Sequence, residues 1–120
     1  MARTREISKQ RIQEGLHQVL ADLLRLELRD ERLQFVTITS VALDAALATA
    51  EVWVCAPAGK PNLQSKILAA LDENSPLLRR ELAARVRLRR IPALRFRWDP
   101  APDHAAHMED LIASLPDAHA

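Results

Sequence analysis

The sequence contains only two glycines, Gly15 and Gly59, among its 120 residues. The phosphate-binding loops of dinucleotide and nucleoside-triphosphate enzymes need several closely spaced glycines, so both classes are excluded. A single cysteine, Cys55, permits no internal disulfide and is typical of a reducing compartment. No apolar run approaches the roughly 18 residues of a membrane span, and the first residues lack the apolar stretch of a secretory signal. We therefore expect a cytoplasmic protein with no membrane partner.

Neither sign of charge is in excess over the whole chain, because 17 Lys and Arg side chains are balanced by 16 Asp and Glu side chains. With 48% apolar and 28% charged residues, the composition is that of a soluble globular chain and not of a membrane or disordered one. The length is that of one domain. We assign residues 1–115 to this single domain and residues 116–120 to a short frayed C-terminal tail.

The first half of the chain has clear periodicity. Apolar residues at helical spacing predict a long first helix from Thr4 to about Arg29. β-branched residues and alternating polarity then predict strands over residues 35–41 and 47–55, with a turn around residues 44–46. Two strands joined by so short a turn form an antiparallel hairpin.

The region between the hairpin and the last strand predicts two helices. Asn62 is placed to cap a short helix that follows a loop rich in proline and glycine. Pro76 lacks an amide hydrogen and clashes with the preceding turn, so the helix should bend or stop there. Ser75 as N-cap and Pro76 at the first helical position then start a further helix that runs to about Arg89.

Alternating apolar and basic residues over 94–98 predict a third strand, and a last helix is expected over residues 103–115. The crossover through two helices makes the second and third strands parallel if they are neighbours. The predicted fold is therefore α+β, in the order α-β-β-α-α-β plus a C-terminal helix. Its three-stranded mixed sheet has helices on one face, and the other face is left open.

Arginine is concentrated in one segment. Residues 79–97 hold eight arginines and a single acid, Glu81. The rest of the chain is then net acidic, with 17 − 8 = 9 basic against 16 − 1 = 15 acidic side chains. Such polarity can orient a molecule on a polyanion although the total charge is near zero. The planar guanidinium also makes bidentate contacts with phosphate and stacks on bases.

Three stretches match, in order and spacing, the pattern of a known family. They are residues 36–44 (VTITSVALD), residues 50–54 (AEVWV), and the arginine-rich region with 78–82 (LRREL) and 87–99 (RLRRIPALRFRWD). Together with the element order they resemble the ribosome-binding factor A family, whose fold is a type II KH-like domain. The resemblance covers nearly the whole chain. A KH domain clamps RNA with a GxxG loop between paired helices, but residues 72–75 read Asp-Glu-Asn-Ser, so we expect a kinked helix pair without that clamp.

The resemblance implies a function. A member of this family is a non-catalytic assembly factor that binds the free small (30S) ribosomal subunit. It assists late maturation of 16S rRNA, including processing of its 5′ end, and has particular importance at low temperature. The expected partners are 16S rRNA within the free 30S subunit and other assembly factors. The protein is expected to act as a monomer, with no cofactor and no small-molecule substrate.

A helical wheel of the predicted helix after Pro76 places four arginines on one arc of about 100° beside its apolar side. This arc is the main candidate for a surface that tracks RNA phosphates, and its members are Arg79, Arg80, Arg87 and Arg90. Two further candidates, Arg85 and Arg89, fall nearer the apolar side, where they alternatively cover the core edge and pair with acids. The start of the first helix either extends the patch or is simply solvated, and its basic residues are Arg3, Arg5, Lys9 and Arg11.

Other chemistry has little support in the sequence. Trp53 is the one aromatic residue placed to stack on a base, and the alternative is that it packs against the sheet. His104 and His107 lie three positions apart, but too few further ligands are near in sequence to predict a metal site. No nucleophile, histidine and carboxylate form a recognisable catalytic signature. We therefore expect no catalytic residues and no bound metal.

Two other functions stay open. In the first, the chain is a protein–protein adaptor whose arginine face binds an acidic partner. Binding to ribosomal RNA and to an acidic protein, each measured over a range of salt concentrations, would distinguish this function from RNA binding. In the second, the chain is a small hydrolase-like enzyme, which would require a concave pocket with perturbed acids or histidines.

Overall fold

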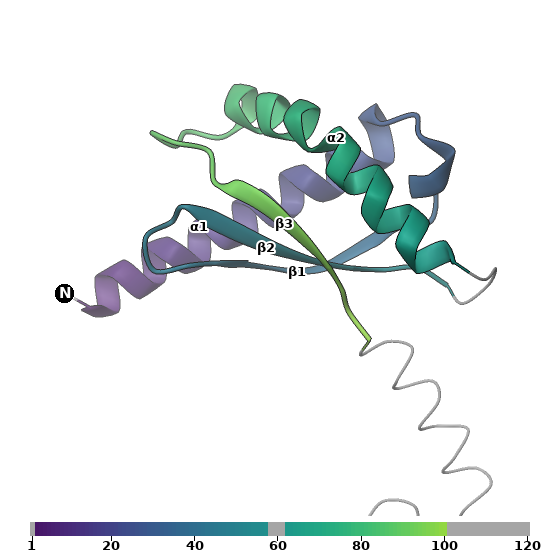
Figure 1. Cartoon of the computed structure of the whole chain (residues 1–120). Helices are drawn as coiled ribbons and strands as arrows, with labels where there is room; N and C mark the ends of the chain where they lie inside the picture. Colours follow the sequence, from purple (N-terminus) through teal and green to yellow (C-terminus); the bar gives the residue numbers. More distant parts are fainter. Residues whose placement is uncertain (1, 58–61, 101–120) are drawn as a thin grey trace, which may run out of the picture.

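The computed structural model describes residues 2–57 and 62–100, with side chains from Ser8 onward in these ranges. Figure 1 shows long helices packed on one sheet, and within the described ranges the sheet has three strands. The elements in chain order are α1 (Ala2–Asp22), β1 (Thr37–Leu43), β2 (Thr49–Cys55), α2 (Leu63–Arg85) and β3 (Ala93–Trp98). The predicted C-terminal helix and the predicted tail lie outside the described residues.

The first helix agrees with its prediction. α1 continues into a π-helical turn, Leu23–Glu27, which closes where the Leu28 amide donates to the Leu23 carbonyl at 3.0 Å. Leu28 is extended and ends the helical path. A short 3-10 turn, Glu31–Leu33, then leads into β1. It begins at Asp30, whose carboxylate accepts the Arg32 amide at 3.0 Å.

The sheet has the order β1-β2-β3. β1 and β2 are antiparallel, and β2 and β3 are parallel, as the crossover predicts. The register places Val41 opposite Val52 and Val52 opposite Phe96, so one face receives apolar side chains from all three strands. Thr39 forms a bulge in β1, where the register shifts between Ile38 and Ser40. The predicted α+β, KH-like fold class is confirmed.

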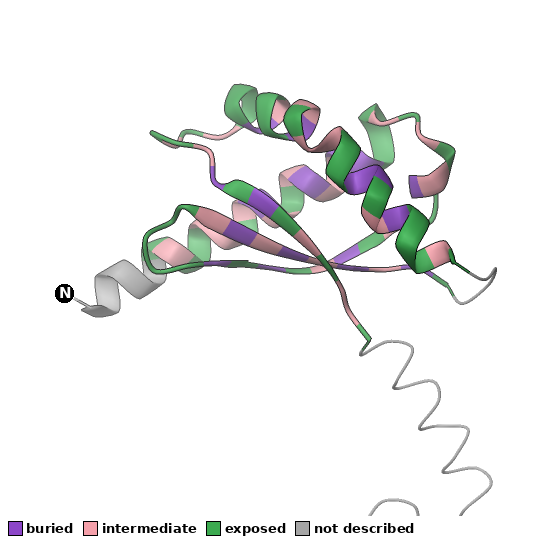
Figure 2. Cartoon of the chain, viewed as in Figure 1, coloured by how far each residue is buried: buried purple, intermediate pink, exposed green. Residues whose placement is uncertain are grey.

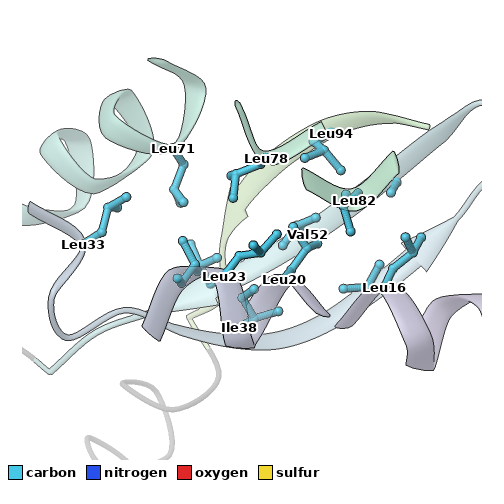
Figure 3. Packing of buried hydrophobic residues seen from close by; sticks show 14 of the residues in the cluster. Leu16, Leu20, Leu23, Leu33, Ile38, Val52, Leu71, Leu78, Leu82 and Leu94 are labelled. Atoms are coloured by element: carbon cyan, nitrogen blue, oxygen red, sulfur yellow. The ribbon is translucent and has the colours of Figure 1, made fainter. Parts of the chain in front are cut away.

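The core lies between this face and the two helices, as Figure 3 shows. Leu16 and Leu20 of α1 and Leu23 of the π-helical turn point toward Leu82 of α2 and Val52 of the sheet. These side chains form a continuous buried cluster, and none of the polar or charged side chains in the described ranges is buried with them. Burial of this leucine layer is the main favourable contribution to folding.

Polar side chains of α1 cover the free edge of the sheet. β1 is an edge strand, and unpaired edges invite pairing with other chains. Gln13 accepts the Leu43 amide at 2.9 Å, and Nε2 of His17 donates to the Ile38 carbonyl at 2.9 Å. α1 therefore packs its leucines on the core and bonds the strand edge with the adjacent polar positions.

The two helices predicted between residues 62 and 89 are one continuous helix. The predicted start of a separate helix at Ser75 and Pro76 is therefore wrong, whereas the expected kink is present as a bend. Pro76 lies inside α2, whose axis bends near its middle (Figure 1). Leu71 and Leu78 are buried on either side of the proline and anchor both halves to the same core. This tertiary packing outweighs the local cost of the missing hydrogen bond.

The ends of α2 also differ from the prediction. The Asn62 side chain makes no capping hydrogen bond, and its backbone has a left-handed conformation with φ of 68°. Its carbonyl instead accepts the Lys66 amide at 3.0 Å. At the other end α2 stops at Arg85, because Val86 turns to an extended conformation. The expected continuation of this helix to Arg89 is therefore wrong.

A polar cluster ties the segment before β1 to the middle of α2. Arg32 holds Asp30 with two hydrogen bonds, at 3.0 and 2.7 Å, and reaches Glu73 of α2 at 2.5 Å. Asn74 donates to the Ala70 carbonyl at 2.8 Å and to Asp30 at 3.3 Å. The Arg32 guanidinium holds the pKa of Asp30 down at about 2. The sequence that replaces the KH loop thus serves as a structural junction.

Removing core volume should destabilise the protein. Leu82 has no exposed surface, so Leu82→Ala should lower the free energy of unfolding by about 2–5 kcal/mol through the lost transfer energy and the cavity left behind. Chemical denaturation measures this change. As a control, Leu26→Ala removes a side chain that is 67% exposed and should stay within about 0.5 kcal/mol of the parent. Equal losses in the two variants would contradict the described core.

Replacing the proline inside α2 should stabilise the protein. Pro76→Ala restores an amide that can donate within the helix, and we expect the free energy of unfolding to rise by roughly 1–3 kcal/mol. The same denaturation measurement reports it. A loss of stability would show that Leu71 and Leu78 need the bend that the proline imposes.

Acid should weaken the polar cluster. The pKa of Asp30 is lower in the folded chain than its usual value of about 3.9. Its stabilisation is therefore present above about pH 4 and is lost as the pH falls toward 2. Thermal unfolding of the parent and of Asp30→Asn should differ at pH 6, and the difference should shrink over this window. A constant difference from pH 6 to pH 2 would show that the charge of Asp30 contributes nothing.

Candidate nucleic-acid interface

The segment 86–92, between α2 and β3, carries three arginines in an irregular backbone. Arg87, Arg89 and Arg90 are exposed, and no other described side chain pairs with them by a hydrogen bond or an ion pair. Because α2 ends at Arg85, the predicted helical arc that joins Arg79 and Arg80 to Arg87 and Arg90 does not exist. The structure instead presents the last three arginines on a loop.

Apolar neighbours fix the direction of this loop. Val86, Leu88 and Ile91 pack against the core, and Pro92 is buried. The arginines between them are consequently directed outward. The Ala93 amide donates to the Ala48 carbonyl at 2.9 Å and joins the end of the loop to the start of β2.

Arg79 has a structural role within this loop. Its guanidinium donates to the carbonyls of Ile91 and Pro92, at 3.0 and 3.3 Å. The side chain thus holds the path between α2 and β3 through two hydrogen bonds to the backbone. Of the four arginines on the predicted arc, Arg79 positions the loop, while Arg80 is exposed on α2 without a partner among the described side chains.

The loop lies beside α1 and the hairpin turn, which meet at one end of the molecule (Figure 1). A groove of about 430 Å³ separates them, and we call it the basic groove. Its lining residues are Ile12, Leu43, Ala46, Leu47, Leu88, Arg89, Arg90 and Pro92. Arg11 precedes Ile12 on α1 and is exposed, while Lys9 is half-buried. Of the first helix, only Ile12 lines the groove beside Arg89 and Arg90, and the side chains of Arg3 and Arg5 lie outside the described residues.

Other arginines are neutralised by acids. Arg85 pairs with Glu81 of its own helix. It also pairs with Glu27 of the π-helical turn that follows α1, at a distance of 3.4 Å. This agrees with the alternative in which Arg85 covers the core edge and pairs with acids. Arg97 on β3 pairs with Glu51 of β2 at 3.2 Å. These residues offer less free charge to a polyanion than the loop arginines do.

The outer face of the sheet adds one basic residue that the site prediction omits. Arg95 is exposed on β3, and it has no ion pair with the described acids. The strict alternation of apolar and basic residues over 94–98 already indicated that Arg95 lies on the basic face of the strand. Trp53 is half-buried on the same outer face, while its neighbours Val52 and Val54 are buried on the inner face.

The described residues offer little for other chemistry. Within residues 8–57 and 62–100, no three potential metal ligands come together. His104 and His107 lie outside the described residues. No helix in the described part of the chain is long and apolar enough to cross a membrane. The feature of this end of the molecule that is available for binding is therefore its exposed, unpaired positive charge.

Comparison with known proteins identifies the family. A family model described as Ribosome-binding factor A matches residues 8–112. The ribosome-binding factor A of Natranaerobius thermophilus is 36% identical over 107 residues, which cover 89% of this chain and 81% of that protein. The crystal structure of ribosome-binding factor A from Thermus thermophilus has a TM-score of 0.67 at 31% identity, over 75% of this chain and 93% of that one.

A second similar structure is a homology model of the Thermus thermophilus factor that was fitted into the cryo-EM map of a 30S-RbfA complex. It has a TM-score of 0.60 at 32% identity and covers 73% of this chain and 91% of that one. Sequence and fold agree over most of the length, and the chain belongs to the ribosome-binding factor A family.

Proposed function

We propose that this protein is a non-catalytic assembly factor that binds the free small ribosomal subunit through the phosphate backbone of 16S rRNA. Its bound form assists late maturation of that rRNA, including processing of the 5′ end, with most effect at low temperature. Membership of the ribosome-binding factor A family supports binding to the small subunit. The related Thermus thermophilus factor has been fitted into a map of a 30S complex, which supports the same partner.

The observation that carries the proposal is the unpaired charge beside the basic groove. Arg87, Arg89 and Arg90 project from one loop, and the described acids leave them free. Guanidinium groups without carboxylate partners keep their donors available for phosphate oxygens. Each phosphate that they neutralise releases counterions, which favours binding at low salt.

The surface suits recognition of RNA shape more than of base sequence. The stretch that replaces the GxxG loop lies inside α2, and its acids Asp72 and Glu73 are exposed and repel phosphate. The backbone clamp of ordinary KH domains therefore has no counterpart here. Contacts made by the loop arginines would position the protein on the RNA backbone and carry little sequence information.

Binding alone can assist maturation. A protein that binds one arrangement of an RNA more tightly than another shifts the population toward that arrangement. At low temperature, misfolded RNA helices persist longer, so the same binding energy corrects more of them. No covalent step is needed.

Loss of the loop arginines should weaken binding to RNA. Arg87→Gln with Arg90→Gln should lower the affinity for free small subunits and for deproteinised 16S rRNA, and should reduce the slope of log affinity against log salt by about one for each lost contact. Both side chains are exposed, so thermal unfolding should not change. Co-sedimentation across a salt series measures the affinity.

The matched control is Arg25→Gln with Arg29→Gln at the other end of α1, where both residues are also exposed. This pair should leave the affinity for deproteinised rRNA within about twofold of the parent. If both pairs weaken rRNA binding equally, or if neither changes the salt slope, the loop is only solvated. Tight binding of an acidic protein in place of rRNA would instead favour the adaptor function.

A further inference from the structure

A second groove lies at the C-terminal end of α1, whereas the basic groove meets α1 at Ile12. It has a volume of about 850 Å³. The end of α1, the π-helical turn and the segment that enters β1 form its walls, with Leu24, Leu28, Leu33 and Val36 among the lining residues. The two grooves share no lining residue, so they can contact different components of one large partner.

The rim of this groove carries an aromatic side chain in solvent. Phe35 is 69% exposed and lines the groove. Only three large apolar side chains are exposed in the described ranges, and two of them, Leu26 and Phe35, belong to the segment 23–36. Figure 2 shows that this segment is mostly exposed or half-buried. Exposed apolar residues that gather beside a groove are typical of a contact surface for another molecule.

The exposure of Phe35 is imposed by the fold. Leu33 is buried, and Val36 packs against the core from the half-buried position after Phe35. The Val36 amide donates to the Leu33 carbonyl at 3.3 Å, and Arg32 fastens the preceding turn to Glu73. With its neighbours fixed in this way, the ring of Phe35 is held outward in a preorganised position.

The charges around this groove favour a protein over RNA. Its lining includes three acids, Asp22, Asp30 and Glu31, and two arginines, Arg25 and Arg29. This balance gives no attraction for a polyanion, in contrast to the basic groove. An apolar centre with charges of both signs at its rim is the composition of a protein–protein interface.

Two charged side chains at the rim, Glu31 and Arg29, indicate which charges a bound protein would present. Asp22 is bonded by Gln18 and Arg25, and Asp30 by Arg32. Glu31 and Arg29 are exposed, and neither is paired with another described side chain. A complementary segment would therefore present one basic and one acidic side chain beside an apolar one.

We propose that this groove docks a protein component of the small subunit, whose apolar side chain packs on Phe35 while its charged neighbours meet Glu31 and Arg29. The inference rests on the proposed function, because it assigns the second half of the same complex. The basic groove is then held on rRNA, and the second groove on a ribosomal protein. The orientation of the factor on the subunit follows from both contacts.

Affinity measurements on two ligands test the proposal. Phe35→Ser should lower the affinity for intact free small subunits by about fivefold or more, as expected for a central interface aromatic. It should leave the affinity for deproteinised 16S rRNA within about twofold, since the groove does not contact RNA. Its thermal unfolding should equal that of the parent, because Phe35 is 69% exposed. The variant with Arg87→Gln and Arg90→Gln should lose affinity for both ligands.

Crosslinking identifies the contact directly. Phe35→p-benzoylphenylalanine, irradiated on purified small subunits, should give an adduct with a ribosomal protein that survives ribonuclease. The same replacement at Arg87 should give an adduct with rRNA. An adduct of position 35 that is only with rRNA would overturn the proposal in favour of base stacking. No adduct at position 35 while position 87 reacts would show that the groove faces solvent, and failure of both positions would instead contradict the proposed function.

Discussion

Burial of one face of a three-stranded sheet governs how the other parts of this molecule are arranged. A sheet this small cannot cover its own apolar side chains, so leucines from α1 and α2 must cover them. The same layer obliges α2 to continue through Pro76, because Leu71 and Leu78 are both needed in the core. It also leaves the polar side of α1 free to bond the edge of β1 through Gln13 and His17.

Once the helices are placed, the distribution of acids decides which arginines are available to bind another molecule. Arg32, Arg85 and Arg97 are paired with carboxylates that join neighbouring elements. Arg79 is used on backbone carbonyls. Three arginines that are left unpaired, Arg87, Arg89 and Arg90, gather on the loop before β3. Apolar residues anchor the backbone there, and no described acid lies close enough to form an ion pair. The chain can therefore be nearly neutral as a whole and still present a concentrated positive surface.

The two grooves differ in chemistry, and this difference supports a two-point contact with the small subunit. At the basic groove, free guanidinium groups suit phosphate; at the second groove, a held phenylalanine and balanced charges suit a protein surface. Two separate contacts on one rigid domain restrict orientation far more than one contact does. A factor whose role is to stabilise one arrangement of a large RNA benefits from such a defined orientation.

The periodic elements, the antiparallel hairpin, the parallel third strand and the concentration of arginine could all be predicted from the sequence, because they depend on local spacing and on general rules of chain crossover. The sequence also carried the family resemblance that the comparisons bear out.

Local spacing could not decide between a bend and a stop at Pro76. The helix continues because burial on both sides of the proline outweighs the local penalty. Arg79 and Arg85 are occupied by contacts with residues distant in sequence, which are carbonyl groups for Arg79 and an acid for Arg85. Arg87 and Arg90 lie on a loop because α2 ends at Arg85. The exposure of Phe35, which alternation had placed in a strand, likewise follows from how its neighbours pack against distant leucines, and no local pattern encodes that packing.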